Sequence, residues 1–144
     1  MWLEILNFLH FVGLAFGLGG ATIMAIISNK AEKHKEVALA MRQIGPSIVK
    51  FIWVGLILLI VSGIALPFYI KWQLNKNMLL VKHVLVFWIV IMGIILGVGS
   101  RKRNRLAPKE NPSEEFLKTK RLVRFFSIIN LILWYLITIF SVFI

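Results

Sequence analysis

The 144-residue chain contains no cysteine. This absence excludes disulfide bonds, thiolate metal centres, c-type haem attachment and catalysis by a cysteine nucleophile. Aspartate is absent as well, and all six acidic residues are glutamates: Glu4, Glu32, Glu36, Glu110, Glu114 and Glu115. None of these glutamates lies deep inside an apolar segment, so the sequence offers no carboxylate relay for protons across a membrane.

Apolar residues are abundant, at 59% of the chain, and the mean hydropathy is +0.85. Segments 3–28, 47–70, 78–100 and 125–144 each reach the length of about 20 residues that crosses a bilayer as a helix. The first segment is retained as a span, because it lacks a basic start and exceeds the apolar length of a signal peptide. We therefore predict an all-α fold, an up-and-down membrane bundle of four helices in one domain, 1–144.

The positive charges are concentrated in two links, 29–46 and 101–124. All but three of the 17 lysines and arginines lie in or beside these links, the exceptions being Lys71, Lys76 and Lys82. The positive-inside rule then places both links in the cytoplasm and both termini on the other side of the inner (plasma) membrane. This topology, with anionic lipid on the cytoplasmic face, explains the net charge of +11 without nucleic acid.

The helix boundaries are predicted from capping signals. Gly45 and Pro46 predict a turn, with the first helix continuing beyond the membrane up to it and Pro46 opening the second helix. In the other long link, Asn111 is predicted as the N-cap of the last helix, followed by Pro112 at its first position and Glu114 at its third.

Two histidines and a lysine lie within the apolar segments. His10 is about eight residues into the first segment, and His83, next to Lys82, is about six residues into the third. The first and third helices of an up-and-down bundle are parallel, so both imidazoles should lie roughly 10 Å below the same surface. Ionisable residues inside membrane spans are rare and usually functional.

Small residues share the helical faces of both histidines. At about 100° per residue, Gly13 and Gly17 lie on the side of His10, and Gly93 and Gly97 lie beneath His83. These glycines either let helices approach closely or leave space for a flat macrocycle beside an imidazole. The sequence keeps both explanations open.

The embedded polar residues also have two interpretations. Each histidine either bonds to a hydroxyl or carbonyl group of a neighbouring helix, with Ser62 and Tyr135 as candidates, or binds a ligand. In the absence of cysteine, haem b is the cofactor most compatible with two imidazoles in an apolar bundle, with His10 and His83 as iron ligands. Lys82 either extends to the membrane surface or pairs with a propionate of the cofactor.

Two short motifs resemble a known superfamily. "LHFVGLAFGLGG" at 9–20 and "LLVKHVLV" at 79–86 are similar to helices of small membrane proteins that include the copper-resistance D proteins and the HemJ-like protoporphyrinogen oxidases. The resemblance implies a helical membrane bundle with a haem or porphyrin site near His10, supported by Lys82. It assigns no role to His83.

Three functions follow as hypotheses. The first is a haem b-binding membrane protein with a redox or electron-transfer role, whose cofactor site contains His10, Lys82, His83, Gly13 and Gly17. The second is an oxidoreductase that oxidises protoporphyrinogen IX. The third is a non-catalytic bundle that binds lipid, a protein partner or a second copy of itself.

Overall fold

The computed structural model describes residues 1–69, 76–107 and 111–142, and this part of the chain forms four helices. They are α1 (Trp2–Ala31), α2 (Lys35–Tyr69), α3 (Lys76–Arg105) and α4 (Glu114–Val142). Each is long and apolar enough to cross a membrane. The predicted all-α architecture of a multi-pass membrane protein is therefore confirmed, whereas the identity of the membrane and the side on which each link lies stay predictions.

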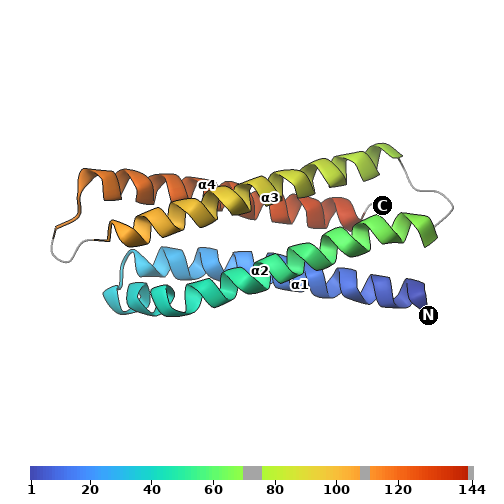
Figure 1. The fold of residues 1–144 in the computed structure, drawn as a ribbon, viewed down its shortest axis with the longest axis horizontal. Helices are drawn as coiled ribbons and strands as arrows, with labels where there is room; N and C mark the ends of the chain where they lie inside the picture. The colour runs from blue at the N-terminus through green and yellow to red at the C-terminus, as the bar shows by residue number, and fades with distance from the viewer. Residues whose placement is uncertain (70–75, 108–110, 143–144) are drawn as a thin grey trace.

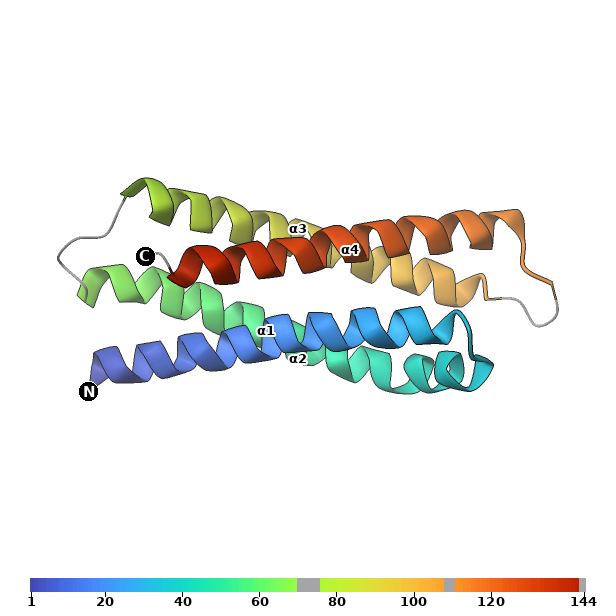
Figure 2. The same ribbon diagram turned by 180° about the vertical axis from the view of Figure 1, so that it is seen from behind.

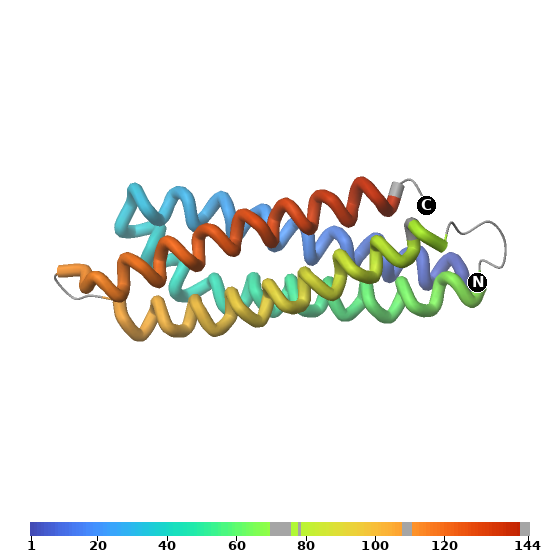
Figure 3. The backbone as a smooth tube through the Cα atoms, turned by 90° about the horizontal axis from the view of Figure 1, so that it is seen from above, coloured from blue at the N-terminus to red at the C-terminus, as the bar shows by residue number. Residues whose placement is uncertain are grey.

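The helices alternate in direction, so that the start of α1 and the end of α4 lie at the same end of an elongated bundle (Figure 1). α1 packs along α2, α3 packs along α4, and α1 also contacts α4, whereas the backbones of α2 and α3 come close at few points. Figure 2 shows the bundle from behind, with α1 and α4 in front, and Figure 3 shows it from above. We call the end where α1 begins and α4 ends the histidine end, and the opposite end, where α1 and α3 end and α2 and α4 begin, the basic end.

The outer surface of the bundle is apolar. Large side chains on three helices are more than 60% exposed, among them Phe11 on α1, Phe68 on α2 and Phe87 on α3. Lipid acyl chains would cover such a surface in a membrane, where no hydrophobic force drives the helices together. The packing inside the bundle therefore has to come from close contact between side chains and backbones.

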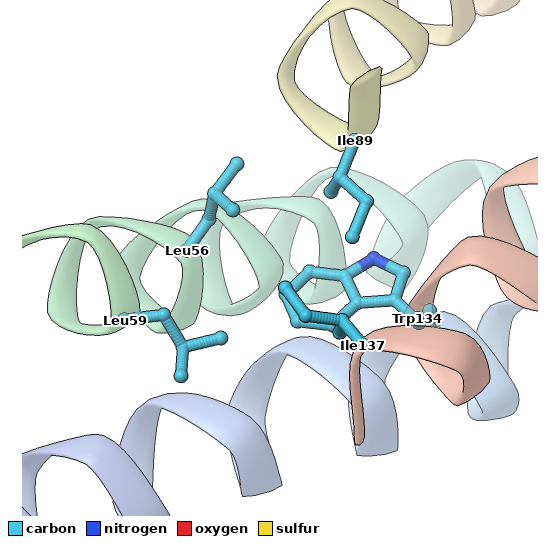
Figure 4. Close-up of a cluster of buried hydrophobic side chains, with 6 residues drawn as sticks. Leu56, Leu59, Ile89, Trp134 and Ile137 are labelled. Atoms are coloured by element: carbon cyan, nitrogen blue, oxygen red, sulfur yellow. The ribbon is translucent and has the colours of Figure 1, made fainter. Parts of the chain in front are cut away.

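Trp134 of α4 lies at the centre of the buried cluster. Its indole is completely buried, and it packs with Leu56 and Leu59 of α2, Ile89 of α3 and Ile137 of α4 (Figure 4). This cluster joins the α1–α2 pair to the α3–α4 pair midway along the bundle. The indole Nε1 has no hydrogen-bond partner among the described residues.

Glycines bring α1 and α2 into backbone contact. A Cβ atom at Gly55 would lie 2.5 Å from the amide nitrogen of Gly17 and 2.6 Å from the carbonyl oxygen of Gly13. A Cβ at Gly17 would also overlap the ring of Trp134. Gly13 and Gly17 are thus part of a helix-packing surface, and their partner residue on α2 is Gly55.

The predicted turn at Gly45 and Pro46 is wrong. α1 ends at Ala31 and α2 already begins at Lys35, so α2 continues through Gly45 and Pro46. The first turns of α2 pack on α1, where the Ser28 hydroxyl donates to the sulfur of Met41 at 3.8 Å. Membrane proteins tolerate a proline inside a helix where neighbouring helices support it.

The predicted N-cap of α4 is displaced by two residues. α4 begins at Glu114, and the Ser113 hydroxyl accepts a hydrogen bond from the backbone N–H of Phe116 at 3.2 Å. Ser113 rather than Asn111 is therefore the N-cap, because its side chain satisfies one of the free amides of the first turn. The predicted span ends at 70 and at 143–144 lie outside the described residues.

Candidate functional site

A cavity of about 130 Å³ lies near the histidine end of the bundle. His10 of α1 and both Lys82 and His83 of α3 contribute to its wall, and apolar side chains from all four helices complete it. The three embedded polar residues that the sequence singles out are therefore brought together around one space.

His10 is held by a buried serine on α2. Its Nδ1 lies 2.9 Å from the Oγ of Ser62, and that Oγ lies 2.6 Å from the carbonyl oxygen of Leu58. A serine hydroxyl carries one hydrogen, which here is donated to the Leu58 carbonyl, so Ser62 Oγ must accept from His10 Nδ1–H. The neutral imidazole then carries its free lone pair on Nε2.

Lys82 points toward that free nitrogen. Its Nζ lies 3.5 Å from His10 Nε2, and the side chain is half-buried. An ammonium group can only donate hydrogen bonds, so this contact fits the tautomer that Ser62 imposes on His10. The geometry places a cation at the cavity wall, next to the imidazole.

His83 is held differently. Its Nδ1 lies 2.8 Å from the carbonyl oxygen of Leu79 on the preceding turn of α3, and the residue is exposed. A carbonyl only accepts, so Nδ1–H is the donor. Both histidines in the cavity wall therefore donate a hydrogen bond through Nδ1.

The structure agrees with some of the other expectations from the sequence and differs from others. Ser62 is a hydroxyl partner of His10, whereas the Tyr135 hydroxyl lies 3.4 Å from that of Thr22. Gly13 and Gly17 are not among the described residues that line the cavity, since they pack against α2 and Trp134. We therefore leave these two glycines out of the site that we propose below.

Six described residues of α2 lie in the cavity wall, and the sequence pointed to none of them. Gly63 and Pro67 are among these six. A Cβ at Gly63 would meet nothing within 4 Å, so this glycine faces open space. The available signal was its position directly after Ser62. In the part of the chain that the structure describes, no three His, Cys, Asp or Glu side chains form a metal-binding group.

Comparisons with protein-family models, with curated proteins and with solved structures find no match to this chain. No family is identified. The resemblance of segments 9–20 and 79–86 to the copper-resistance D and HemJ-like proteins stays a prediction, and the function has to be argued from the cavity itself.

Proposed function

We propose that the cavity at the histidine end binds haem b, with His10 as an iron ligand, and that the protein has a redox or electron-transfer role. The observation that supports this is the arrangement of His10, whose Nδ1–H is donated to Ser62 while Nε2 faces Lys82 at the cavity wall. Histidines that bind metals almost always donate their second ring N–H to a fixed acceptor, which sets the tautomer.

The cavity has the right chemistry and a small volume. Most residues of its wall are leucine, isoleucine or valine, and the imidazoles of His10 and His83 supply nitrogen atoms that can bind a metal. A volume of about 130 Å³ is close to the roughly 150 Å³ of an apolar cavity that binds benzene. A macrocycle is larger, so its binding requires α2 and α3 to separate.

The backbones of α2 and α3 come close at few points, so such a separation would mainly disrupt side-chain contacts, among them that of Trp53 with Gly93. Two residues of the cavity wall are also exposed, Ile64 on α2 and His83 on α3. The side of the bundle between these two helices therefore offers an apolar ligand a route from the bilayer. The ligand would keep part of its edge in contact with lipid.

Each polar residue then has a distinct role. Ser62 orients His10, and the Lys82 ammonium group pairs with a propionate carboxylate through a charge-assisted hydrogen bond. His83 offers its free Nε2 as a second ligand. A bound haem would supply one-electron transfer.

Absorption spectra of the detergent-purified protein, oxidised and then reduced with dithionite, test this proposal. We expect a Soret band in the native protein and its loss in His10→Ala. His34→Ala is the matched control, because His34 is exposed at the basic end and should leave the spectrum unchanged. Native protein that shows no Soret band even after reconstitution with haem would disprove the proposal and favour a non-catalytic bundle.

His83→Ala separates one-histidine from two-histidine ligation. With His83 as the second ligand, the variant should keep haem but change from a low-spin to a high-spin spectrum. An unchanged spectrum would leave His10 as the only iron ligand of the chain.

A second candidate is oxidation of a porphyrinogen, favoured by the position of Lys82 beside an apolar cavity. The cation would hold a propionate of the substrate as it would hold one of haem. Growth of a strain that lacks protoporphyrinogen oxidase, after expression of this chain, tests the activity. Failure to grow despite normal amounts of protein in the membrane would argue against it.

A further inference from the structure

A second cavity, also of about 130 Å³, lies at the basic end of the bundle. It is formed where α1 and α3 end and where α2 and α4 begin. Its wall contains three cationic side chains from three helices, Arg42 of α2, Arg103 of α3 and Lys120 of α4. This cavity is separate from the histidine end and independent of the function proposed above.

The positive charge of this cavity is not neutralised by the protein. Its one acidic wall residue, Glu32, forms an ion pair with Arg124, at 2.5 Å between Oε2 and Nη1. Within the described part of the chain, Arg42, Arg103 and Lys120 form neither an ion pair nor a side-chain hydrogen bond. Three cations therefore face the space without a partner.

The burial of Arg103 makes this arrangement unfavourable without an anion. Arg103 lies beyond the predicted span 78–100 and is half-buried, and burial together with the nearby charge of Arg42 lowers its pKa. An arginine side chain nevertheless stays protonated in a protein. Partial desolvation of the Arg103 guanidinium group beside the exposed cation Arg42 costs free energy, which a bound anion would offset.

The shape and surroundings of the cavity indicate which anion. Guanidinium groups bind phosphate oxygens in pairs through their fork of N–H donors. The remaining wall includes apolar side chains, namely Ala31, Ala38 and Met41 and, on α4, Phe116. A ligand with a phosphate group attached to an apolar body fits this combination.

We infer that this cavity binds the phosphate group of an anionic phospholipid of the leaflet at the basic end. Arg42 and Arg103 hold the phosphate oxygens, Lys120 adds a third positive charge from α4, and the apolar wall contacts the glycerol and upper acyl region. One bound lipid would thereby link α2, α3 and α4. Clusters of basic residues next to a membrane span are typical sites for acidic headgroups.

Thermal unfolding of the purified protein in detergent tests this site. We expect added phosphatidylglycerol to raise Tm by several degrees, and phosphatidylcholine or inorganic phosphate to have little effect. The double variant Arg42→Gln/Arg103→Gln should bind phosphatidylglycerol at least tenfold more weakly. Native mass spectrometry should show one tightly retained anionic lipid in the native protein and none in this variant.

The matched control removes the same charge at the same end without touching the cavity. Arg101 and Arg105 are exposed and are not in the described cavity wall, so Arg101→Gln/Arg105→Gln should keep the tight lipid. Equal losses in both double variants would overturn the site in favour of diffuse attraction. Equal stabilisation by inorganic phosphate would overturn the lipid in favour of a free anion.

A conservative variant covers the case in which the double variant does not fold. Arg103→Lys keeps the charge but loses the planar fork of donors. It should fold and bind phosphatidylglycerol with an affinity between those of the native protein and the double variant. Unchanged affinity would contradict the assigned role of Arg103.

Discussion

Two neighbouring helix contacts in this bundle differ sharply. α1 and α2 approach until the Gly13, Gly17 and Gly55 backbones meet, whereas the backbones of α2 and α3 come close at few points and leave a cavity beside His10 and His83. We call these the closed contact and the open contact. Both are surrounded by the same kind of apolar side chains, so overall hydrophobicity does not distinguish them.

The difference follows from what stabilises helices in lipid. Because acyl chains are as apolar as leucine, association depends on close packing and on hydrogen bonds. The closed contact supplies the packing. At the open contact the backbones of α2 and α3 stay apart. The polar contact beside it joins α3 to α1, where Lys82 Nζ lies 3.5 Å from His10 Nε2.

The largest effect should come from removing the side chain that supports the closed contact. Trp134→Ala leaves a cavity against Gly17 and the α2 leucines, and we expect a loss of about 3 kcal/mol in the free energy of unfolding, at the lower end for such truncations. Reversible unfolding in mixed micelles measures it. A loss below about 1 kcal/mol would show that the buried cluster is not tightly packed.

A smaller but more specific effect should come from forcing the closed contact apart. Gly55→Ala places a methyl group against the α1 backbone, and overpacking of this kind costs about 1–3 kcal/mol. Gly19→Ala is the control, since a Cβ there meets nothing within 4 Å. The control should be neutral or more stable by up to about 1 kcal/mol, because alanine favours helix. Equal losses in both variants would contradict the role of the glycine contact.

The open contact should tolerate a larger residue in the cavity wall, but this residue should prevent binding of the proposed haem. Gly63→Leu directs a side chain into the free space of the cavity, so we expect nearly unchanged stability and at least a tenfold weaker affinity for haem. Gly19→Leu is the control, because a Cβ at Gly19 meets nothing within 4 Å, and it should change neither the stability nor the affinity for haem. A Soret band of normal intensity in Gly63→Leu would place the ligand elsewhere.

The smallest effect should come from the charged contact between α1 and α4 at the basic end. Glu32→Gln removes the ion pair with Arg124, and both side chains of this pair are partly exposed. Such pairs contribute up to about 1 kcal/mol to the free energy of unfolding. Unfolding at low and at high salt should show that the difference disappears as salt screens the native pair. A difference that persists at high salt would point to a role beyond charge.

The residues around the cavity at the histidine end were predictable to different degrees. His10, Lys82 and His83 stand out in the sequence because ionisable groups are rare in apolar segments. Gly63 and Pro67 do not stand out, because their place in the cavity wall depends on how α2 is rotated relative to α1 and α3. Ser62 could be suggested as a partner by its depth, but its bond to His10 in particular required the structure.

The errors at the helix ends have a similar origin. Gly45 and Pro46 are local turn signals, but the packing of early α2 residues on α1 overrides them. Asn111 and Ser113 are both good N-caps. Which of the two caps α4 depends on where α4 starts to pack.

The sequence by itself determined the four apolar helices and the three embedded polar residues, because length, hydropathy and charge are local properties of the chain. Only the tertiary structure decided which face of each helix is turned inward. That rotation directs Gly13 and Gly17 toward Gly55 and Trp134, and it directs His10 toward Ser62 and Lys82. Hydropathy is nearly uniform around these helices and therefore does not fix their rotation. Close packing and hydrogen bonds between the helices fix it instead.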